Sequence, residues 1–127
     1  MTSLDTNVIL RFLLRDVAYQ AVRAVRLLDG SQCYVTDVVL TETIFVLEKV
    51  YEAPRAEIAS IMKLLTGWPN FICNRSLMNE VIALFDARPS LSIVDCYAAV
   101  EAETFQNQLA TFDKKLLKHG GRHVVEA

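Results

Sequence analysis

Four acidic residues of this chain could bind a metal ion if the fold brings them together. They are Asp5, Glu42, Asp95 and Asp113. Carboxylates that are held close together repel one another, so a group of them must bind a cation or take up protons. A hard divalent cation such as Mg²⁺ or Mn²⁺ prefers oxygen ligands and keeps water and phosphate oxygens in its coordination shell. Such a group would support metal-assisted hydrolysis of a phosphodiester bond.

Glu42 lies in a predicted helix of residues 37–51, away from the polar side of that helix. At about 100° per residue, its neighbours one turn away include Val38 and Phe45. Burying an ionised carboxylate among apolar side chains costs on the order of several kcal/mol. We therefore expect Glu42 to be paired, protonated or bound to a cation. The alternative is an ordinary salt bridge to an arginine or to Lys49.

Asp95 lies in the first turn of a predicted helix of residues 92–105. The same helical face continues through Ala98 and Ala102. Small residues let a helix lie close to a sheet, so we expect Asp95 to face inward. The alternative is a capping box with Ser92, since the S-x-x-D spacing fits one.

Asp5 and Asp113 each lie between a predicted strand and a predicted helix. Asp5 follows residues 1–4, which can form only a very short strand, and Asp113 follows the strand 108–111. In a parallel sheet, strand ends and the starts of the following helices share one edge, where ligands gather. We expect these two acids to meet Glu42 and Asp95 at that edge. Alone, Asp113 could serve only as a helix cap.

The elements that would position these acids alternate between short strands and helices. The predicted helices span residues 6–15, 19–28, 37–51, 54–65, 76–87, 92–105 and 113–118. The predicted strands span residues 1–4, 32–35, 70–73, 108–111 and 122–125. Thr36 is the expected N-cap of the third helix, and Gly30 is the expected terminator of the second. This alternation predicts one α/β/α domain over residues 1–127, with a short and mostly parallel central sheet flanked by helices.

Composition favours a compact and ordered domain. The chain has 127 residues, of which 53% are apolar and 22% charged. The net charge of −2 neither supports nor excludes nucleic acid as a partner. We expect most other acids, including Asp37 and Glu48, to lie on solvated surfaces or at helix ends.

Several other classes of protein are disfavoured. The chain has three cysteines, an odd number with no C-x-x-C, which indicates buried apolar thiols in a reducing compartment. There is no signal peptide and no apolar run of membrane-spanning length, so we expect a cytoplasmic protein without a membrane partner. His119 and His123 do not pair with cysteines at zinc spacing. A phosphoacceptor domain would need a second acid beside Asp5.

Four segments of the chain resemble PIN-domain ribonucleases, most of all the VapC toxins of type II toxin–antitoxin pairs. They are L-D-T-N-V at 4–8, T-E-T-I-F-V-L-E-K-V-Y at 41–51, V-D-C-Y-A-A-V-E-A at 94–102 and A-T-F-D-K-K-L at 110–116. The segments occur in the order of the family, and the resemblance spans nearly the whole chain.

The resemblance implies an Mg²⁺- or Mn²⁺-dependent endoribonuclease, a hydrolase acting on phosphodiester bonds. Such a toxin cuts structured RNA, inhibits translation and is silenced by a cognate antitoxin. Carried over residue by residue, the catalytic and metal-binding acids of the family fall on Asp5, Glu42, Asp95 and Asp113. The family also implies a homodimer.

The resemblance also suggests roles for individual residues. Asp5, Asp95 and Asp113 would hold the metal, and Glu42 would ligate it or orient the attacking water. Two flanking polar positions of the family, which could orient a carboxylate or a water, fall on Asn7 and Thr111.

Basic residues beside the acids could hold the phosphates of RNA. Arg11 and Arg15 follow Asp5 on the first helix, and Lys114 and Lys115 follow Asp113 on the last. The alternative is that they are ordinary solvated residues, or that the arginines bind a partner's acids.

The two predicted helices of residues 37–65 carry more apolar residues than one core face needs. The surplus includes Ile58, Ile61, Met62 and Leu65. Exposed apolar surface of this kind marks an interface with a second copy or with an antitoxin.

Two alternatives remain open. One is a PIN-fold RNA-processing nuclease outside a toxin–antitoxin pair. The other is a PIN-fold binding module whose active site is weakened.

Overall fold

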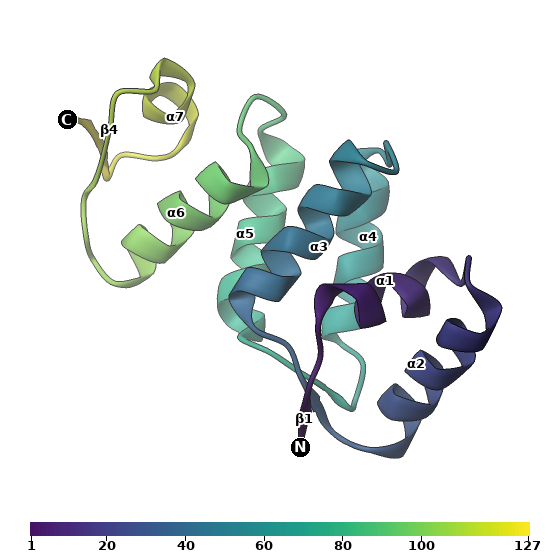
Figure 1. Cartoon of the computed structure of the whole chain (residues 1–127). Helices are drawn as coiled ribbons and strands as arrows, with labels where there is room; N and C mark the ends of the chain where they lie inside the picture. The colour runs from purple at the N-terminus through teal and green to yellow at the C-terminus, as the bar shows by residue number, and fades with distance from the viewer.

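A computed structural model describes all 127 residues of the chain and has an α/β fold (Figure 1). The strands are β1 (Thr2–Ser3), β2 (Cys33–Tyr34), β3 (Phe71–Ile72), β4 (Leu109–Thr111) and β5 (Val124–Glu126). The helices are α1 (Thr6–Leu14), α2 (Ala18–Gly30), α3 (Asp37–Lys49), α4 (Arg55–Thr66), α5 (Arg75–Ala87), α6 (Ile93–Thr104) and α7 (Lys114–His119). Every predicted element occurs, and the ends differ from the predicted ones by one or two residues.

The strands are divided between two parallel sheets rather than one central sheet. One has the order β1-β2-β3, with Cys33 beside both Thr2 and Phe71. The other contains only β4 and β5, with Leu109 beside Val124. β1 is therefore an edge strand of the first sheet, and β4 has no neighbour on the side away from β5.

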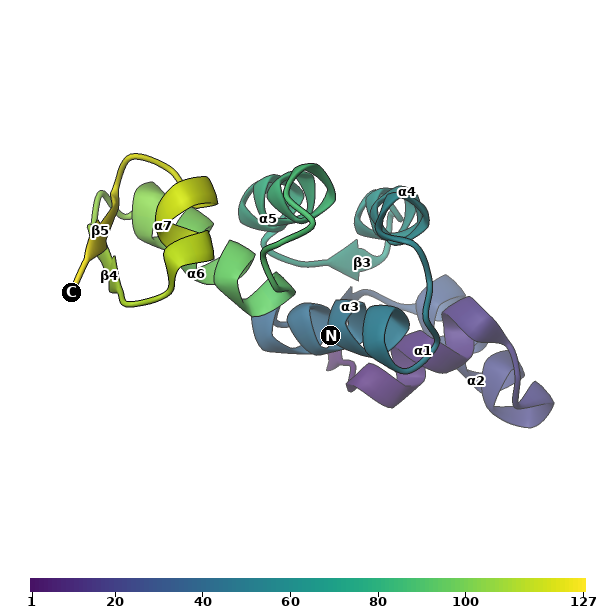
Figure 2. The same ribbon diagram turned by 90° about the horizontal axis from the view of Figure 1, so that it is seen from above.

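Helices cover both faces of the three-stranded sheet, which confirms the α/β/α class. Figure 2 shows α4 and α5 on one side of β3 and α1, α2 and α3 on the other. Helix α6 packs against α5 and α3 and leads to β4, α7 and β5 at one end of an elongated molecule (Figures 1 and 2). We call residues 107–127, which hold these last three elements, the C-terminal unit.

One apolar core holds these elements together. Its 27 buried residues include Ile9 of α1, Leu28 of α2, Phe71 of β3 and Phe85 of α5. The strands are short, and the fully buried strand residues Cys33 and Phe71 lie in β2 and β3, between helices on both faces. Three helices begin with side-chain caps that the sequence suggests, and Asp113 is the cap of α7. In the other two, the hydroxyl of Thr36 accepts from Val39 N at 3.1 Å, and that of Ser92 accepts from Asp95 N at 3.0 Å.

The apolar residues of α4 belong to the core. Ile58 and Met62 have 0% of their surface exposed and Leu65 has 3%, while Ile61 is half-buried. The prediction that these residues form an exposed interface is therefore wrong. They are covered by the sheet and α5 of the same chain.

The three cysteines are free thiols. Cys33 and Cys96 are fully buried, and Cys73 is half-buried. Burial raises the pKa of Cys96 to about 11 and also raises the pKa of Cys73. Both thiols are therefore neutral at physiological pH and act as small apolar side chains.

An ion pair joins α3, α4 and α5. Arg55 Nε lies 2.6 Å from Glu48 Oε2, and about 15% of each side chain is exposed (16% and 15%). A second guanidinium nitrogen donates to Phe85 O at 2.9 Å, and the guanidinium stacks over the Phe85 ring at 4.0 Å. Glu48 lies at the end of α3, as predicted, but it is not solvated, because the helix places it beside the start of α4.

This ion pair yields a stability prediction. Arg55→Met should lower the free energy of unfolding by about 3 kcal/mol, because it leaves the Glu48 carboxylate and a carbonyl without their donor. The matched control is Arg11→Met. Arg11 pairs with Asp16 at 2.7 Å, but that carboxylate is 42% exposed, so the loss should stay below about 1 kcal/mol. Urea unfolding measures both, and equal losses would contradict this account of the core.

Candidate active site

The carboxyl ends of the three paired strands lie at one edge of the sheet, because the strands are parallel. Asp5 follows β1 there, Asp37 follows β2, and Asn74 follows β3. Asp5 is the N-cap residue of α1, but its exposed side chain makes no capping hydrogen bond. The next side chain, Thr6, is buried, and its hydroxyl is the one buried side-chain polar atom without a hydrogen-bond partner.

A hydrogen bond places the start of α6 beside the start of α3. The hydroxyl of Tyr97 donates to Asp37 Oδ2 at 2.7 Å. Burial raises the pKa of Tyr97 to about 12, and the bond to the Asp37 carboxylate adds to the effect. Asp37 lies at a helix end, as predicted, but it is half-buried and bonded across helices and is not part of a solvated surface. The sequence offers no signal for this contact, since 60 residues separate the partners.

Asp95 lies in the first turn of α6, and its side chain is half-buried. Its backbone N–H donates to the hydroxyl of Ser92, as the capping alternative suggests. The carboxylate itself makes no hydrogen bond and no ion pair. Ala99 and Ala102 are buried, so the alanine face is the inner face of the helix.

Glu42 is exposed on the second turn of α3, and the expectation of a buried carboxylate is wrong. Its apolar neighbours Val38 and Phe45 are themselves 77% and 47% exposed, so water reaches the carboxylate. No salt bridge involves Glu42, which also removes the alternative of a bond to Lys49. Glu42 lines a shallow, mainly apolar groove that Val94 of α6 also lines.

Asp113 belongs to the C-terminal unit and caps α7. Its Oδ1 accepts from Lys115 N at 2.8 Å and from Leu116 N at 3.1 Å. The hydroxyl of Thr111 accepts from Asp113 N at 3.0 Å, so Thr111 orients this residue through its backbone. Neither Lys114 nor Lys115 forms an ion pair with the carboxylate.

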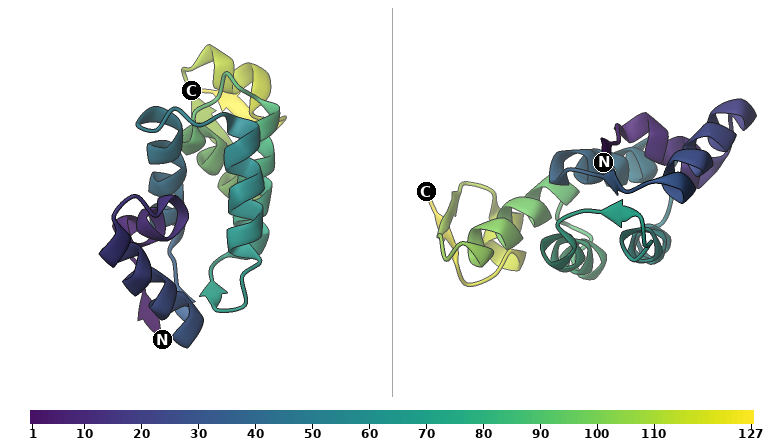
Figure 3. Two further views of the ribbon diagram at one scale, coloured as in Figure 1. Left: turned by 90° about the vertical axis from the view of Figure 1, so that its right-hand side faces the viewer. Right: turned by 90° about the horizontal axis from the view of Figure 1, so that it is seen from below.

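The single chain does not complete a metal site. No three His, Cys, Asp or Glu side chains lie together where they could hold one ion. Asp5, Glu42 and Asp95 lie outside the C-terminal unit. β4, which leads to Asp113, lies well away from β1 (Figures 1 and 3). The ligand type suits Mg²⁺ or Mn²⁺, since carboxylates are hard oxygen ligands, but their arrangement in one chain does not.

The polar and basic side chains around α1 face a groove between α1 and α2. Asn7 lines this groove with Arg11 and Arg23. Arg23 is the residue that sequence reasoning missed, because only the packing of α2 on α1 brings it there. Arg15 has local partners: its Nε donates to Phe12 O at 3.2 Å, and its guanidinium stacks on the ring of Phe12.

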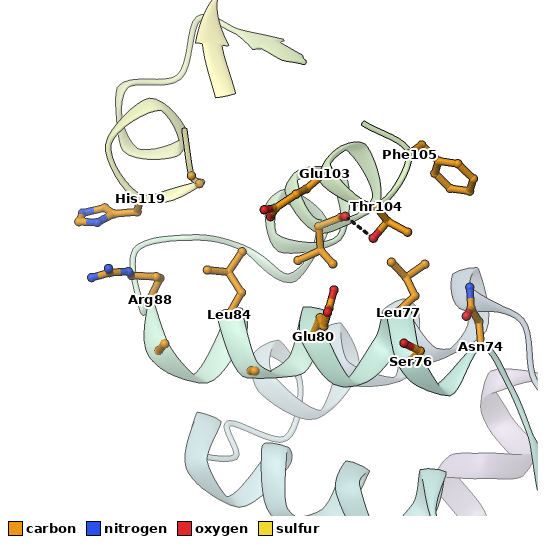
Figure 4. A pocket seen from close by; sticks show the side chains of 15 residues that line it. Asn74, Ser76, Leu77, Glu80, Leu84, Arg88, Glu103, Thr104, Phe105 and His119 are labelled. Carbon is orange, nitrogen blue, oxygen red and sulfur yellow. Dashed lines mark hydrogen bonds between the residues drawn. The ribbon is translucent and has the colours of Figure 1, made fainter. Parts of the chain in front are cut away.

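A separate groove of about 830 Å³ runs between α5, α6 and the end of α7. Glu80 and Glu103 face its middle, and Arg88 and His119 lie at one end (Figure 4). It contains none of the four predicted acids, so it is not the candidate active site.

The fold is an α/β domain in which acidic residues follow the ends of parallel strands. Comparison with known proteins identifies the family to which this domain belongs. Residues 3–121 match the family model of the PIN domain, so the chain belongs to the PIN domain family. This family has a nuclease-type fold, whose members generally use divalent metal ions and act on nucleic acid. None of the curated proteins compared with the chain matches it. No helix is long and apolar enough to cross a membrane.

The Tyr97–Asp37 bond yields a pH prediction. The folded pKa of Tyr97, about 12, lies above the ordinary value of 10.0, so its stabilisation is complete below pH 10 and is lost as the pH rises through 12. Tyr97→Phe should therefore lower the free energy of unfolding by about 1–2 kcal/mol at pH 7, and the difference should disappear by about pH 12. Tyr19→Phe, at a 65% exposed position, is the control. A pH-independent difference would contradict the assignment.

Proposed function

We propose that this protein is an endoribonuclease that hydrolyses RNA phosphodiester bonds with Mg²⁺ or Mn²⁺. The observation that carries the proposal is Asp95, a half-buried residue whose carboxylate makes no ion pair or hydrogen bond, in the first turn of α6 near the edge where Asp5 follows β1. A carboxylate without a protein donor or a cationic partner keeps its oxygens available to a hard divalent cation. The partnerless hydroxyl of Thr6 beside Asp5 also favours a missing ligand there.

The proposed metal ligands are Asp5, Asp95 and Asp113, and Glu42 is proposed to ligate the ion or to orient the attacking water. A bound Mg²⁺ or Mn²⁺ would supply an activated water and neutralise phosphate charge. Thr111 supports Asp113 through the hydrogen bond to its backbone.

Basic residues on both parts of the chain suit the RNA phosphates. Lys114 and Lys115 are exposed and free of ion pairs. Asn7, Arg11 and Arg23 share the groove beside α1. Arg11 would have to exchange its bond to Asp16 for a phosphate, and that exposed pair is weak enough to allow it.

The central test is RNA cleavage by acid variants. Asp5→Asn and Asp95→Asn should each lower the cleavage rate on the order of 100-fold or more, the scale seen when one electrostatic group of an active site is removed. Cleavage should need added Mg²⁺ or Mn²⁺ and should stop with EDTA. Asp86→Asn changes an exposed acid of α5 and should leave the rate unchanged.

Two results would contradict this assignment. One is cleavage by Asp5→Asn or Asp95→Asn at the parental rate. The other is a folded parental chain that cuts no RNA with either metal, which would favour a binding module with a weakened active site.

We also propose that this nuclease is the toxin of a type II toxin–antitoxin pair of the VapC kind, acting in the cytoplasm as a homodimer of one PIN domain spanning residues 1–127. A toxin of this kind must offer a surface to its antitoxin. The groove beside Glu42 is one, since Val38, Phe45 and Val94 are all exposed there.

Expression in growing cells tests the toxin role. The parental chain should arrest growth and translation, and the product of a small reading frame immediately upstream should relieve the arrest. Asp5→Asn should not arrest growth, and sequencing of RNA 5′ ends should show new cut sites only with the parental chain. Normal growth together with RNA cleavage in vitro would instead point to an RNA-processing nuclease.

A further inference from the structure

The two sheets each leave one edge strand with a free side. In β1, Thr2 N donates to Gln32 O and Leu4 N donates to Tyr34 O, so Thr2 and Leu4 face β2. Successive residues of a strand alternate in direction, so the backbone N–H and C=O of Ser3 point away from the sheet. Ser3 is exposed and stands at the free edge.

β4 also has unpaired backbone groups on its side away from β5. Leu109 N donates to His123 O, and Thr111 O accepts from Ala127 N, so Leu109 and Thr111 face β5. The backbone groups of Ala110 and Phe112 therefore point to the other side. Phe112 is 82% exposed.

Parallel strands with one unpaired side, such as β1 and β4, are not expected to be stable in water. Parallel sheets are found with both faces covered, and a ribbon of two strands is marginal alone in water. Residues Leu109 and Thr111 of β4 are only half-buried, and Ala110 is exposed. The β4–β5 ribbon therefore lacks a neighbour, and an uncovered edge is a template for pairing with another strand.

Within one chain, β4 cannot reach β1 unless packed contacts of α6 are broken. Helix α6 is held by Cys96 and Ala99, which are fully buried, and by the bond from Tyr97 to Asp37. The C-terminal unit is held to α6, because His123 Nε2 lies 2.6 Å from Ala99 O and Asn107 N donates to Ala102 O at 2.8 Å. Figures 1 and 3 show the N-terminal end of the chain, where β1 lies, apart from the C-terminal unit.

We propose that a second copy of this chain fills both edges, so that β1 of each copy pairs in parallel with β4 of the other. In this exchanged dimer, Ser3 N donates to Ala110 O of the other copy, and Phe112 N of that copy donates to Ser3 O. This register sets Ser3 opposite Thr111. It gives each copy a five-stranded sheet of order β3-β2-β1-β4-β5, in which the last two strands come from the other copy.

The register also completes the acidic site. Two residues after the Ser3–Thr111 pair, Asp5 lies opposite Asp113, at the strand spacing of about 4.8 Å. Each site then takes Asp5, Glu42 and Asp95 from one copy and Asp113 from the other. The catalytic part of this inference rests on the proposed nuclease function, whereas the strand pairing does not.

Disulfide trapping tests the pairing without any need for activity. Directly paired strand positions are close enough for a disulfide. The double variant Ser3→Cys/Thr111→Cys should give a covalent dimer under mild oxidation, with the bridge mapped to the two introduced cysteines. Each single variant and the parental chain are the controls, and they should stay free of this bridge. A disulfide within one chain, or no disulfide in the folded double variant, overturns the proposal.

Light scattering provides a second test. The parental chain should have twice the 14.3 kDa mass of one chain. Ala110→Pro removes a free-edge donor of β4 without touching its bonds to β5, and it should give a monomer. Ala110→Val keeps the donor and favours a strand, and it should stay dimeric. A monomeric parental chain, or a dimeric Ala110→Pro variant, overturns the proposal.

Mixing of inactive chains tests the shared site. Asp5→Asn and Asp113→Asn chains, unfolded and refolded together at equal amounts, should recover about a quarter of the parental activity, because half of the dimers are mixed and one of their two sites is intact. Sites formed within one chain would give no recovery, which overturns the shared site. If the parental chain has no nuclease activity, the proposed function fails, while the disulfide result still decides the pairing.

Discussion

The packing of α6 against α5 and α3 determines where the last part of the chain can lie. Cys96 and Ala99 are fully buried in that contact, and Tyr97 bonds to Asp37 across it. Because His123 joins the C-terminal unit to α6, β4 follows the helix and cannot turn back to β1. The acids are therefore divided between two parts of the molecule, and the free edges of β1 and β4 result from the same contact.

The four carboxylates, which are divided between two parts of the molecule, share one property. None of them has a basic partner, although the chain has 13 lysines and arginines. The firmest ion pair of the chain instead joins Glu48 to Arg55 in the core. A set of acids kept free of cationic side chains is suited to a metal ion, and the sheet completed by a second copy would bring the set together. In the proposed exchanged dimer, the acidic site of this chain is complete only when two copies pair.

Much of the fold could be predicted from the sequence because local signals agree with the packing. The helix caps at Thr36 and Ser92 and the apolar spacing of the helices locate the elements to within one or two residues. Predictions that depended on helix phase were less successful. Glu42 is exposed because Val38 and Phe45 beside it are exposed, and no periodicity states which apolar face of a helix the fold will cover.

Contacts between distant segments could not be predicted at all. The Tyr97–Asp37 bond, the position of Arg23 beside Asn7 and the division of the strands into two sheets all depend on which helices pack together. A pattern of alternating strands and helices predicts parallel pairing, but it does not say whether the neighbour of β1 belongs to the same chain. The family resemblance proposes which acids form the site, and the structure shows that these acids do not lie together in one chain.

Mn²⁺ binding to the purified chain, followed by isothermal titration calorimetry, shows whether the sheet completed by a second copy forms the metal site. The parental dimer should bind Mn²⁺, and the affinity should fall by at least about tenfold in Asp5→Asn and in the monomeric Ala110→Pro variant. A parental dimer that binds no Mn²⁺ would exclude a metal site formed by these acids. Equal affinity in the Ala110→Pro monomer would show that the site is complete in one chain.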